Sequence, residues 1–580
     1  MNTSAVRRGG WIRVLRGISL ESLALRTWPW CLARAQILAL GVAILLSVAA
    51  LVHIGSLAKG WNPALSNDTQ VFFYPALRVL NEDSSLKTLL DPFLTAPLER
   101  PPNSDEVKPL LVSTQRAWSL LFEFLNPAYV HPSHHVMSYY VTFSLVLALL
   151  ACVFWGWSLN APWVGVGTGV IALLNSWMIP NAYFSTYNGG SLVLAILSYA
   201  FLYSRLRYPW VAGALMTLTL FYNQSLIVCF PALLVPLVFH EGSWRSRLRI
   251  AGLYFGGAVL TWLAFEAVVG IAMVVTGQTF LFRFQLLASY LGRSLNDASD
   301  YFWIYRGFFA PNLFWNYSPA VSLVFVVALG SSVWRWIRGG RERVSLQLGI
   351  FIIAWLAFIE LRNGPKFSRT YSLLLPFVVF FMLWEVRIYW QRVRGWPGWV
   401  KMSFLGVLAL TYVMPERRDL LDMERAFLGF RNAIIKSEHV FYFFSTDTYT
   451  TIFRILLEEQ SNPPKTFRMV SSPCDISGRE AFIAMPPSRG KSLFNAAQKV
   501  DPVIDLTHDR ASGTCGMRKW TARLVKRYPF FTHYPFFVLE DMIESEAMLK
   551  SKAYDWNAYL VGEGQASIWE IAFEESPESL

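Results

Sequence analysis

The sequence predicts a mainly α-helical protein: a polytopic membrane bundle of about eleven spans, followed by a small α/β domain outside the membrane. Hydrophobic residues make up 54% of the 580 residues and charged residues only 16%, whereas soluble proteins carry about 25% charged residues. Apolar stretches of span length fill the first two-thirds of the chain, and basic residues gather in alternate gaps between them. Short strand-like runs replace this pattern after about residue 415, which indicates a second domain.

Eleven segments have the composition expected of membrane spans, which need about 20 mostly apolar residues. They are residues 36–57, 136–157, 161–179, 189–204, 209–222, 225–239, 249–275, 318–336, 345–361, 370–387 and 400–414. The preceding segment 1–35 is basic, which predicts a cytoplasmic N-terminus and a first span that acts as an uncleaved signal anchor. The fifth and sixth segments are short and adjoin at Asn223, so they are either a tight pair of spans or one broken helix.

The basic clusters predict the orientation. They lie in four gaps, at residues 205–207, 240–249, 335–343 and 387–401. With the N-terminus inside, all four gaps fall on the cytoplasmic side, as the positive-inside rule requires. The transmembrane domain 36–414 then exposes two long outside loops, 58–135 and 276–317, and the C-terminus lies outside. The formal net charge of +12 is interpreted as cytoplasmic anchoring charge, and no nucleic-acid partner is expected.

Residues 415–580 are expected to form an extracytoplasmic α/β domain. Strand-like runs lie at 439–444, 467–470 and 481–485, and a helical stretch lies at 449–459. The domain contains Cys474 and Cys515, which can form a disulfide if it lies outside the cytoplasm. The remaining cysteines, Cys31, Cys152 and Cys229, are interpreted as packing residues in or beside spans.

The first outside loop carries the strongest candidate for chemistry. Asp68 precedes a helix-like run that contains Val71 and Phe72. One interpretation is a helix N-cap, because an aspartate oxygen accepts free backbone N–H bonds. The other is a general base, because a carboxylate just above the membrane can deprotonate an acceptor hydroxyl.

Two short motifs resemble the membrane-integral GT-C glycosyltransferases, such as the aminoarabinose transferases and protein mannosyltransferases. In that superfamily an acidic residue in the first outside loop is followed by an aromatic and a small residue, as Asp68, Tyr74 and Ala76 are here. The run Lys366-Phe-Ser-Arg369-Thr-Tyr371 resembles the basic–Arg–Tyr entry into a late helix of the same superfamily. The resemblance covers roughly residues 36–390 and favours general base over cap for Asp68.

The resemblance implies an inverting transfer of a hexose or pentose from a polyprenyl-phosphate donor to an extracytoplasmic acceptor. One position departs from the pattern, since Thr69 stands where a second acid is usual. Glu82 and Asp83 lie further along the same loop and need not meet Asp68. A reaction without a metal or other cofactor is therefore favoured, although a divalent metal stays open.

The donor phosphate needs cations, and arginine and lysine offer charged donors to its oxygens. Arg362, Lys366 and Arg369 lie in one short outside turn, against the positive-inside bias. A second set occupies the loop 276–317 and consists of Arg283, Arg293 and Arg306. These side chains, with Tyr74 and Tyr371, are predicted to bind substrate; the alternative for the cations is snorkelling at the interface.

Glu266 is a lone acid within a span, and such an acid usually faces an interior partner or a cavity. It supports the main alternative, a transporter or flippase for a lipid-linked or anionic solute. A third interpretation is a non-catalytic scaffold with an outside binding domain. The favoured hypothesis is a multi-pass glycosyltransferase of a bacterial inner membrane, with Asp68 as its base.

Overall fold

The computed structural model describes two parts of the chain, a helical part and a sheet. The described residues are 134–173, 187–204, 208–223, 226–227, 229–239, 242–275, 279–281, 319–338, 342–361, 373–392, 429–430, 432–444, 468–470, 473–476, 480–488, 503–505, 510–515, 518–532 and 562–574, with the single residues 41, 45 and 121. Helix predominates among them, and the strands form one small mixed sheet. The first and last predicted spans, 36–57 and 400–414, lie outside these ranges apart from Gly41 and Leu45.

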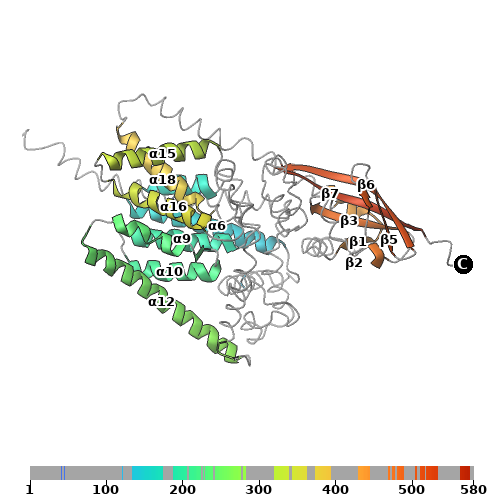
Figure 1. Ribbon diagram of the computed structural model, residues 1–580, viewed down its shortest axis with the longest axis horizontal. Helices are drawn as coiled ribbons and strands as arrows, with labels where there is room; N and C mark the ends of the chain where they lie inside the picture. Colours follow the sequence, from blue (N-terminus) through green and yellow to red (C-terminus); the bar gives the residue numbers. More distant parts are fainter. Residues whose placement is uncertain are drawn as a thin grey trace, which may run out of the picture.

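The helices lie side by side in a bundle (Figure 1). They are α6 (His134–Ser158), α7 (Pro162–Thr168) with its π-helical continuation η3 (Gly169–Leu173), α9 (Tyr187–Tyr203), α10 (Pro209–Tyr222), α11 (Cys229–Ala232), the 3-10 helix η5 (Val235–Phe239), α12 (Trp244–Val275), α15 (Pro319–Ile337), α16 (Arg343–Leu361) and α18 (Leu375–Arg392). Two stretches, Tyr140–Ser158 and Trp244–Ile271, are long and apolar enough to cross a membrane by length and composition, and the other apolar helices are shorter. The number of spans therefore stays a prediction.

The two short segments at 209–239 are separate passes through the bundle. α10 and α12 run in the same direction, because Thr217 donates to the carbonyl of Ala258 (3.1 Å) and Phe221, one turn on, stacks on Phe265 (4.1 Å between centroids). The chain between them must therefore return along the bundle, and α11 and η5 make this return. The return is irregular because Pro231 and Pro236 each lack a backbone N–H and so cannot donate a helical hydrogen bond.

The directions of the other helices follow from paired contacts. Phe325 and Arg335 of α15 meet Phe381 and Glu385 of α18 in the same order, so these helices are parallel. α16 runs against them, since its first residues lie at the Trp384 end of α18 and its later residue Phe351 packs on Phe377. α6 is parallel to α9, because Ser144 lies against Gly189 and, further along both helices, Trp155 packs on Tyr199. α6 is also parallel to α18, because Trp155 packs on Phe380 and Asn160, just beyond α6, accepts from Arg387.

These directions give the bundle two distinct ends. At the end that we name the basic end, α6, α9, α15 and α18 finish and α10, α12 and α16 begin. The described arginines of three predicted basic clusters lie at this end, namely Arg245, Arg247, Arg249, Arg335, Arg338, Arg343 and Arg387, and the orientation in a membrane stays a prediction. Two boundaries differ from the prediction: α12 begins at Trp244 and α18 continues to Arg392, so several of these arginines extend the helices instead of forming loops. The opposite end we name the loop end.

Close backbone contact between α10 and α12 depends on glycine. A Cβ atom at Gly257 would lie 1.9 Å from the carbonyl oxygen of Trp210, and one at Gly213 would lie 1.9 Å from the carbonyl oxygen of Tyr254. Glycine at both positions lets the two backbones touch, a common way for membrane helices to pack. The neighbouring Gly256 faces away from the bundle, with nothing within 4 Å of an added Cβ.

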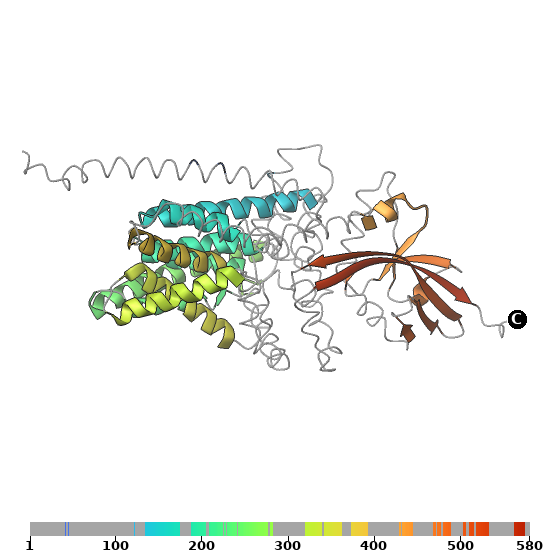
Figure 2. The ribbon, with the colours of Figure 1, turned by 90° about the horizontal axis from the view of Figure 1, so that it is seen from above.

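The sheet has seven strands in the order β2-β1-β3-β7-β6-β5-β4. The strands are β1 (Phe441–Phe444), β2 (Arg468–Val470), β3 (Glu480–Ser488), β4 (Val503–Asp505), β5 (Arg510–Cys515), β6 (Arg518–Thr532) and β7 (Gly562–Glu574). β1 is parallel to β2 and β3, and all other pairs are antiparallel. β6 and β7 form a long twisted ribbon (Figure 2). The predicted strands at 439–444, 467–470 and 481–485 are confirmed within two or three residues at each end, whereas the predicted helix 449–459 lies outside the described residues.

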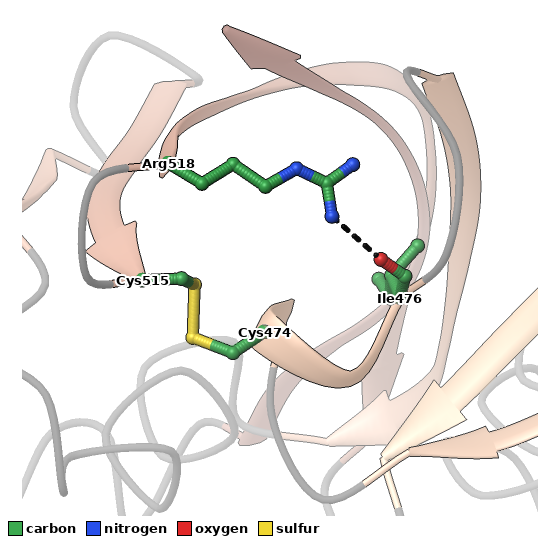
Figure 3. The surroundings of a disulfide bond; sticks show 4 residues. All are labelled: Cys474, Ile476, Cys515 and Arg518. Atoms are coloured by element: carbon green, nitrogen blue, oxygen red, sulfur yellow. Dashed lines mark hydrogen bonds between the residues drawn. A yellow bond between two sulfur atoms is a disulfide. The ribbon is translucent and has the colours of Figure 1, made fainter. Parts of the chain in front are cut away.

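One face of the sheet carries the core of this part. Trp520, Ala522, Ile571, Trp569 and Ile483 alternate along their strands and are buried together. A disulfide joins Cys474, in the short 3-10 helix η6 (Pro473–Asp475), to Cys515 at the end of β5, with 5.5 Å between the Cα atoms (Figure 3). The pairing that the sequence left open is therefore confirmed. Arg518 supports the same corner by donating to the carbonyl of Ile476 (3.1 Å).

Candidate functional site

The predicted site residues lie outside the described residues. These are Asp68, Tyr74, Arg283, Arg293, Arg306, Arg362, Lys366, Arg369 and Tyr371. Their roles stay predictions, but the described helices include α6 after the Asp68 loop and the helices on both sides of the other two loops.

All three loops attach to the loop end of the bundle. The segment that carries Asp68 leads into α6 at His134, which is the loop end of that helix. The segment with Arg283 to Arg306 leaves α12 at its last turn and enters α15 at its first. The cationic turn joins the end of α16 at Leu361 to the start of α18 at Leu375. The described helix ends therefore lie at the same end of the bundle, whereas the predicted base and phosphate ligands themselves lie outside the described residues.

Buried tyrosines lie at this end of the bundle. The hydroxyls of Tyr140 in α6 and Tyr222 in α10 are 2.9 Å apart, and both side chains are buried. Tyr222 packs directly on the backbone of α9, where a Cβ at Gly190 would lie 2.5 Å from its ring. Such a pair fixes three helices at a common level, and it presents polar groups inside an otherwise apolar bundle.

Glu266 lies at the same level of the bundle. It follows Phe265, whose ring stacks on Phe221, the neighbour of Tyr222. Its side chain is 6% exposed, so it faces the bundle interior as the sequence predicted. Asn223, which ends α10, is buried as well. Carboxylate, amide and phenol groups are thus buried at the loop end of the bundle.

Sequence reasoning singled out Glu266 but missed Tyr140, Tyr222 and Asn223. The available signal was position: each is a hydrogen-bonding residue at the loop end of an apolar segment. Their meeting depends on which faces of α6, α9 and α10 pack together, and this rotation is not encoded in the spacing of apolar residues alone.

The basic end carries a different polar layer. Arg335 of α15 forms an ion pair with Glu385 of α18, and both side chains are at least nine-tenths buried. The Arg335 guanidinium also lies over the ring of Tyr389, with 5.6 Å to its centroid. A charge pair in this setting is stable only as a pair, because either partner alone would be an uncompensated buried charge.

A second group of contacts closes the same end. Glu342 accepts from the indole N–H of Trp384 (3.0 Å) and from the backbone N–H of Val344 (3.0 Å), which caps α16. Arg387 donates to the carbonyl of Asn160 (3.2 Å) in the turn between α6 and α7. The sequence interpretation of Arg335 and Arg387 as simple anchoring charges was therefore incomplete, since both also join helices.

The described residues contain no group of three or more His, Cys, Asp or Glu side chains placed to hold a metal ion. His134 and His135 form the first turn of α6, and His131 lies outside the described residues. Whether the loop acids Glu82 and Asp83 bind a metal stays untested, because both lie outside the described residues as well.

No protein-family model matches the sequence. No curated protein matches it. Among solved structures, the crystal structure of ArnT from Cupriavidus metallidurans bound to undecaprenyl phosphate aligns with 80% of this chain and 96% of that chain, with 14% identity and a TM-score of 0.43. A likeness this loose carries no argument about the site, so the function is argued from the residues of this chain.

Proposed function

We propose that this protein is an integral membrane glycosyltransferase that moves a sugar from a polyprenyl-phosphate donor to an extracytoplasmic glycan, lipid or protein acceptor. The observation that carries the proposal is the convergence at the loop end. The Asp68 loop leads into α6 there, the arginine loop and the cationic turn are each attached there by two helix ends, and Tyr140, Tyr222 and Glu266 are buried at the same end.

The proposed reaction is a single displacement with inversion. The Asp68 carboxylate takes the proton of the acceptor hydroxyl, and the acceptor oxygen forms a bond to the anomeric carbon. The bond from that carbon to the phosphate oxygen breaks on the opposite face, and polyprenyl phosphate leaves with the electron pair. Negative charge grows on the phosphate as this bond breaks, so Arg362, Lys366 and Arg369 are proposed to stabilise the transition state.

The remaining predicted ligands have supporting roles in this proposal. Arg283, Arg293 and Arg306 are proposed to hold the donor phosphate from the second loop, and Tyr74 and Tyr371 to line the sugar site. No metal or other cofactor takes part in the proposed steps.

The same proposal places the protein in a bacterial inner membrane as a multi-pass protein, with the loop end and the sheet outside. The Cys474–Cys515 disulfide supports this orientation, because disulfides persist in oxidising compartments and are rare in the cytosol. The clustering of cations at the opposite end of the bundle supports it independently.

The test is release of polyprenyl phosphate by the purified protein, supplied with a panel of polyprenyl-phosphate sugars and an envelope extract as acceptor. Wild type is expected to release it from at least one donor, and Asp68→Asn to lose about 100-fold or more in rate, as removal of a general base does. Asp83→Asn is the matched control in the same loop and should retain activity. An active Asp68→Asn variant would reject Asp68 as the base.

A transporter or flippase is the second candidate, and the buried Glu266 favours it. The two are separated by Glu266→Gln in the release assay and in a vesicle flux assay with the same lipid-linked sugars. Flux that depends on Glu266, together with no release from any donor, would establish the transporter.

A further inference from the structure

The exposed face of the C-terminal sheet carries a row of polar and aromatic side chains across four strands. Cα register places Phe482 of β3 opposite Glu570 of β7, Glu570 opposite Arg523 of β6, and Arg523 opposite Arg510 of β5. The ring of His439 extends the row by stacking on Phe482, with 4.2 Å between centroids. We name these five residues the sheet row. Adjacent strands are about 4.8 Å apart, so the row is roughly 14 Å long from Phe482 to Arg510.

The sheet row faces solvent. The Arg523 side chain is 72% exposed, Arg510 and His439 are exposed, and Glu570 and Phe482 are half-buried. The opposite face holds the core, in which Ile483, Ile571 and Ala522 occupy the alternate positions of the same strands. The row therefore lies on the other face of the sheet from this core. That face is covered on one side of the row, where Phe441, Ala484 and Ile568 are buried, and the side chains of the row itself are open to a partner.

The surface beside the row is flat. On its open side, the next positions are Glu480 of β3, Ala572 of β7, Thr521 of β6 and Ser512 of β5, which lie opposite one another in register. The last three side chains are small, and all four are exposed or half-buried. A flat floor bordered by long polar side chains can accommodate an extended chain of rings.

The chemistry of the row fits sugars. A sugar ring has a C–H face that stacks on aromatic rings such as His439 and Phe482. It also carries neighbouring hydroxyls that bind in pairs to carboxylate and guanidinium groups, and charged partners make the stronger hydrogen bonds. Arg523 already holds Glu570 at 2.7 Å, which orients both groups without burying either.

The arginines of the row can donate to oxygens of a partner. Arg523 lies opposite Arg510, and each has an acid opposite it on its other side, Glu570 of β7 for Arg523 and Asp505 of β4 for Arg510. A guanidinium has five N–H donors, more than one carboxylate accepts, so donors remain for the oxygens of a partner. Hydroxyls supply such oxygens on neutral glycans, and carboxylates supply them on acidic glycans.

Other classes of partner fit less well. A protein interface has an apolar centre, yet among the strand and flanking residues whose side chains are described, only Val440 and Val525 are exposed large hydrophobic residues. A peptide that adds a strand needs a free sheet edge, and the row crosses the inner strands β3, β7 and β6.

We propose that the sheet row is a glycan-binding surface that holds the carbohydrate of the acceptor. The proposal deepens the function proposed above, because it names a glycan-bearing acceptor and assigns its capture to the C-terminal part. Binding to this surface does not require transfer, so it can be tested by itself.

The test uses the whole protein in detergent micelles on an array of neutral and acidic bacterial oligosaccharides, with phosphatidylglycerol vesicles as a separate arm. Wild type is expected to retain at least one oligosaccharide. Arg523→Ala and His439→Ala should each weaken this binding about tenfold, and Arg510→Ala should weaken acidic glycans more than neutral ones. Lys436→Ala, an exposed cation on the short helix before β1, is the matched control and should bind as wild type does.

Arg510→Ala also guards against misfolding, because Arg510 is exposed and its replacement is expected to leave the sheet intact. Asp68→Asn should bind glycans normally while failing in the release assay, which separates loss of capture from loss of chemistry. The proposal is overturned if no oligosaccharide is retained, if row variants bind as tightly as wild type, or if only the vesicles are retained.

Discussion

Replacing Gly257 by alanine should separate α10 from α12. A Cβ atom at this position would lie 1.9 Å from the carbonyl oxygen of Trp210, and 2.6 Å from its carbonyl carbon. Both obstacles are backbone atoms, so a side-chain rotation cannot relieve the clash. The helices must move apart by about 1 Å, and a gap of this size forfeits a quarter to a half of each dispersion contact along the seam.

The neighbouring Gly256 allows the steric term to be isolated. An added Cβ there meets nothing within 4 Å. Both substitutions replace glycine by alanine in the interior of the same helix, so the gain in helix propensity, about 1 kcal/mol, applies equally to each. The difference between the variants is then the overpacking cost, which is typically 1–3 kcal/mol. Gly257→Ala is therefore expected to be less stable than Gly256→Ala by about this amount.

The buried thiols Cys152 and Cys229 provide the assay. A thiol-reactive fluorescent dye reports their exposure as the detergent-solubilised protein is heated, in a Cys31→Ser background. We expect Gly256→Ala to melt at or slightly above the wild-type temperature and Gly257→Ala to melt several °C below it. Equal midpoints for the two variants would refute the backbone contact between α10 and α12.

Three further predictions concern other parts of the molecule. Glu385→Leu should destabilise the bundle by about 3–5 kcal/mol in the same dye assay, because it leaves Arg335 buried and unpaired, whereas the double variant Arg335→Met/Glu385→Leu should recover most of the loss; a double variant as unstable as the single one would contradict this. Removing the disulfide with Cys474→Ser/Cys515→Ser should lower the stability of the sheet by about 4 kcal/mol in the chain-entropy model, for a separation of 41 residues. Proteolysis after residue 440 should then be faster, and a reducing agent should speed it in wild type but not in this variant. Gly513→Val should destabilise the sheet by roughly 1–3 kcal/mol, because its Cβ would lie 2.6 Å from the Trp520 ring. Ser512→Val, on the exposed face, should be tolerated. Equal protease sensitivity of the two variants would count against the placement of Trp520.

The bundle was largely predictable because its signals are local. Apolar length marks each pass, and arginine clusters mark alternate turns. The stretch 209–239 was left open as a tight pair of spans or one broken helix, and the contacts of α10 and α12 favour the pair. The ion pair between Arg335 and Glu385 was not predicted. Both residues lie near helix ends, where charge has a general explanation, and their contact depends on the rotation of α15 against α18.

The sheet was predicted only in its apolar half. Runs of aromatic and aliphatic residues predict β1, β2 and β3. β6 and β7 were missed, although Trp520, Ala522 and Leu524 alternate as a half-buried strand requires. Cations such as Lys519 and Arg523 alternate with these apolar residues, so the segment was not predicted as a strand. The predicted catalytic and binding residues stay predictions, because they lie in loops outside the described residues.

The length of α12 has a consequence for the surrounding lipid. Its first turns carry Arg245, Arg247 and Arg249, and the residues that follow, 250–275, extend about 39 Å, whereas the hydrocarbon core of the bilayer that it is proposed to cross is about 30 Å thick. It also slants across its neighbours (Figure 1), and many of its side chains face outward, among them Leu260, Leu263 and Val268. A helix with this mismatch must tilt further or thicken the bilayer beside it, and either response has an elastic cost that depends on acyl-chain length. The protein is therefore expected to prefer thick membranes, and lipid composition would then act on it through mechanical strain along this one helix.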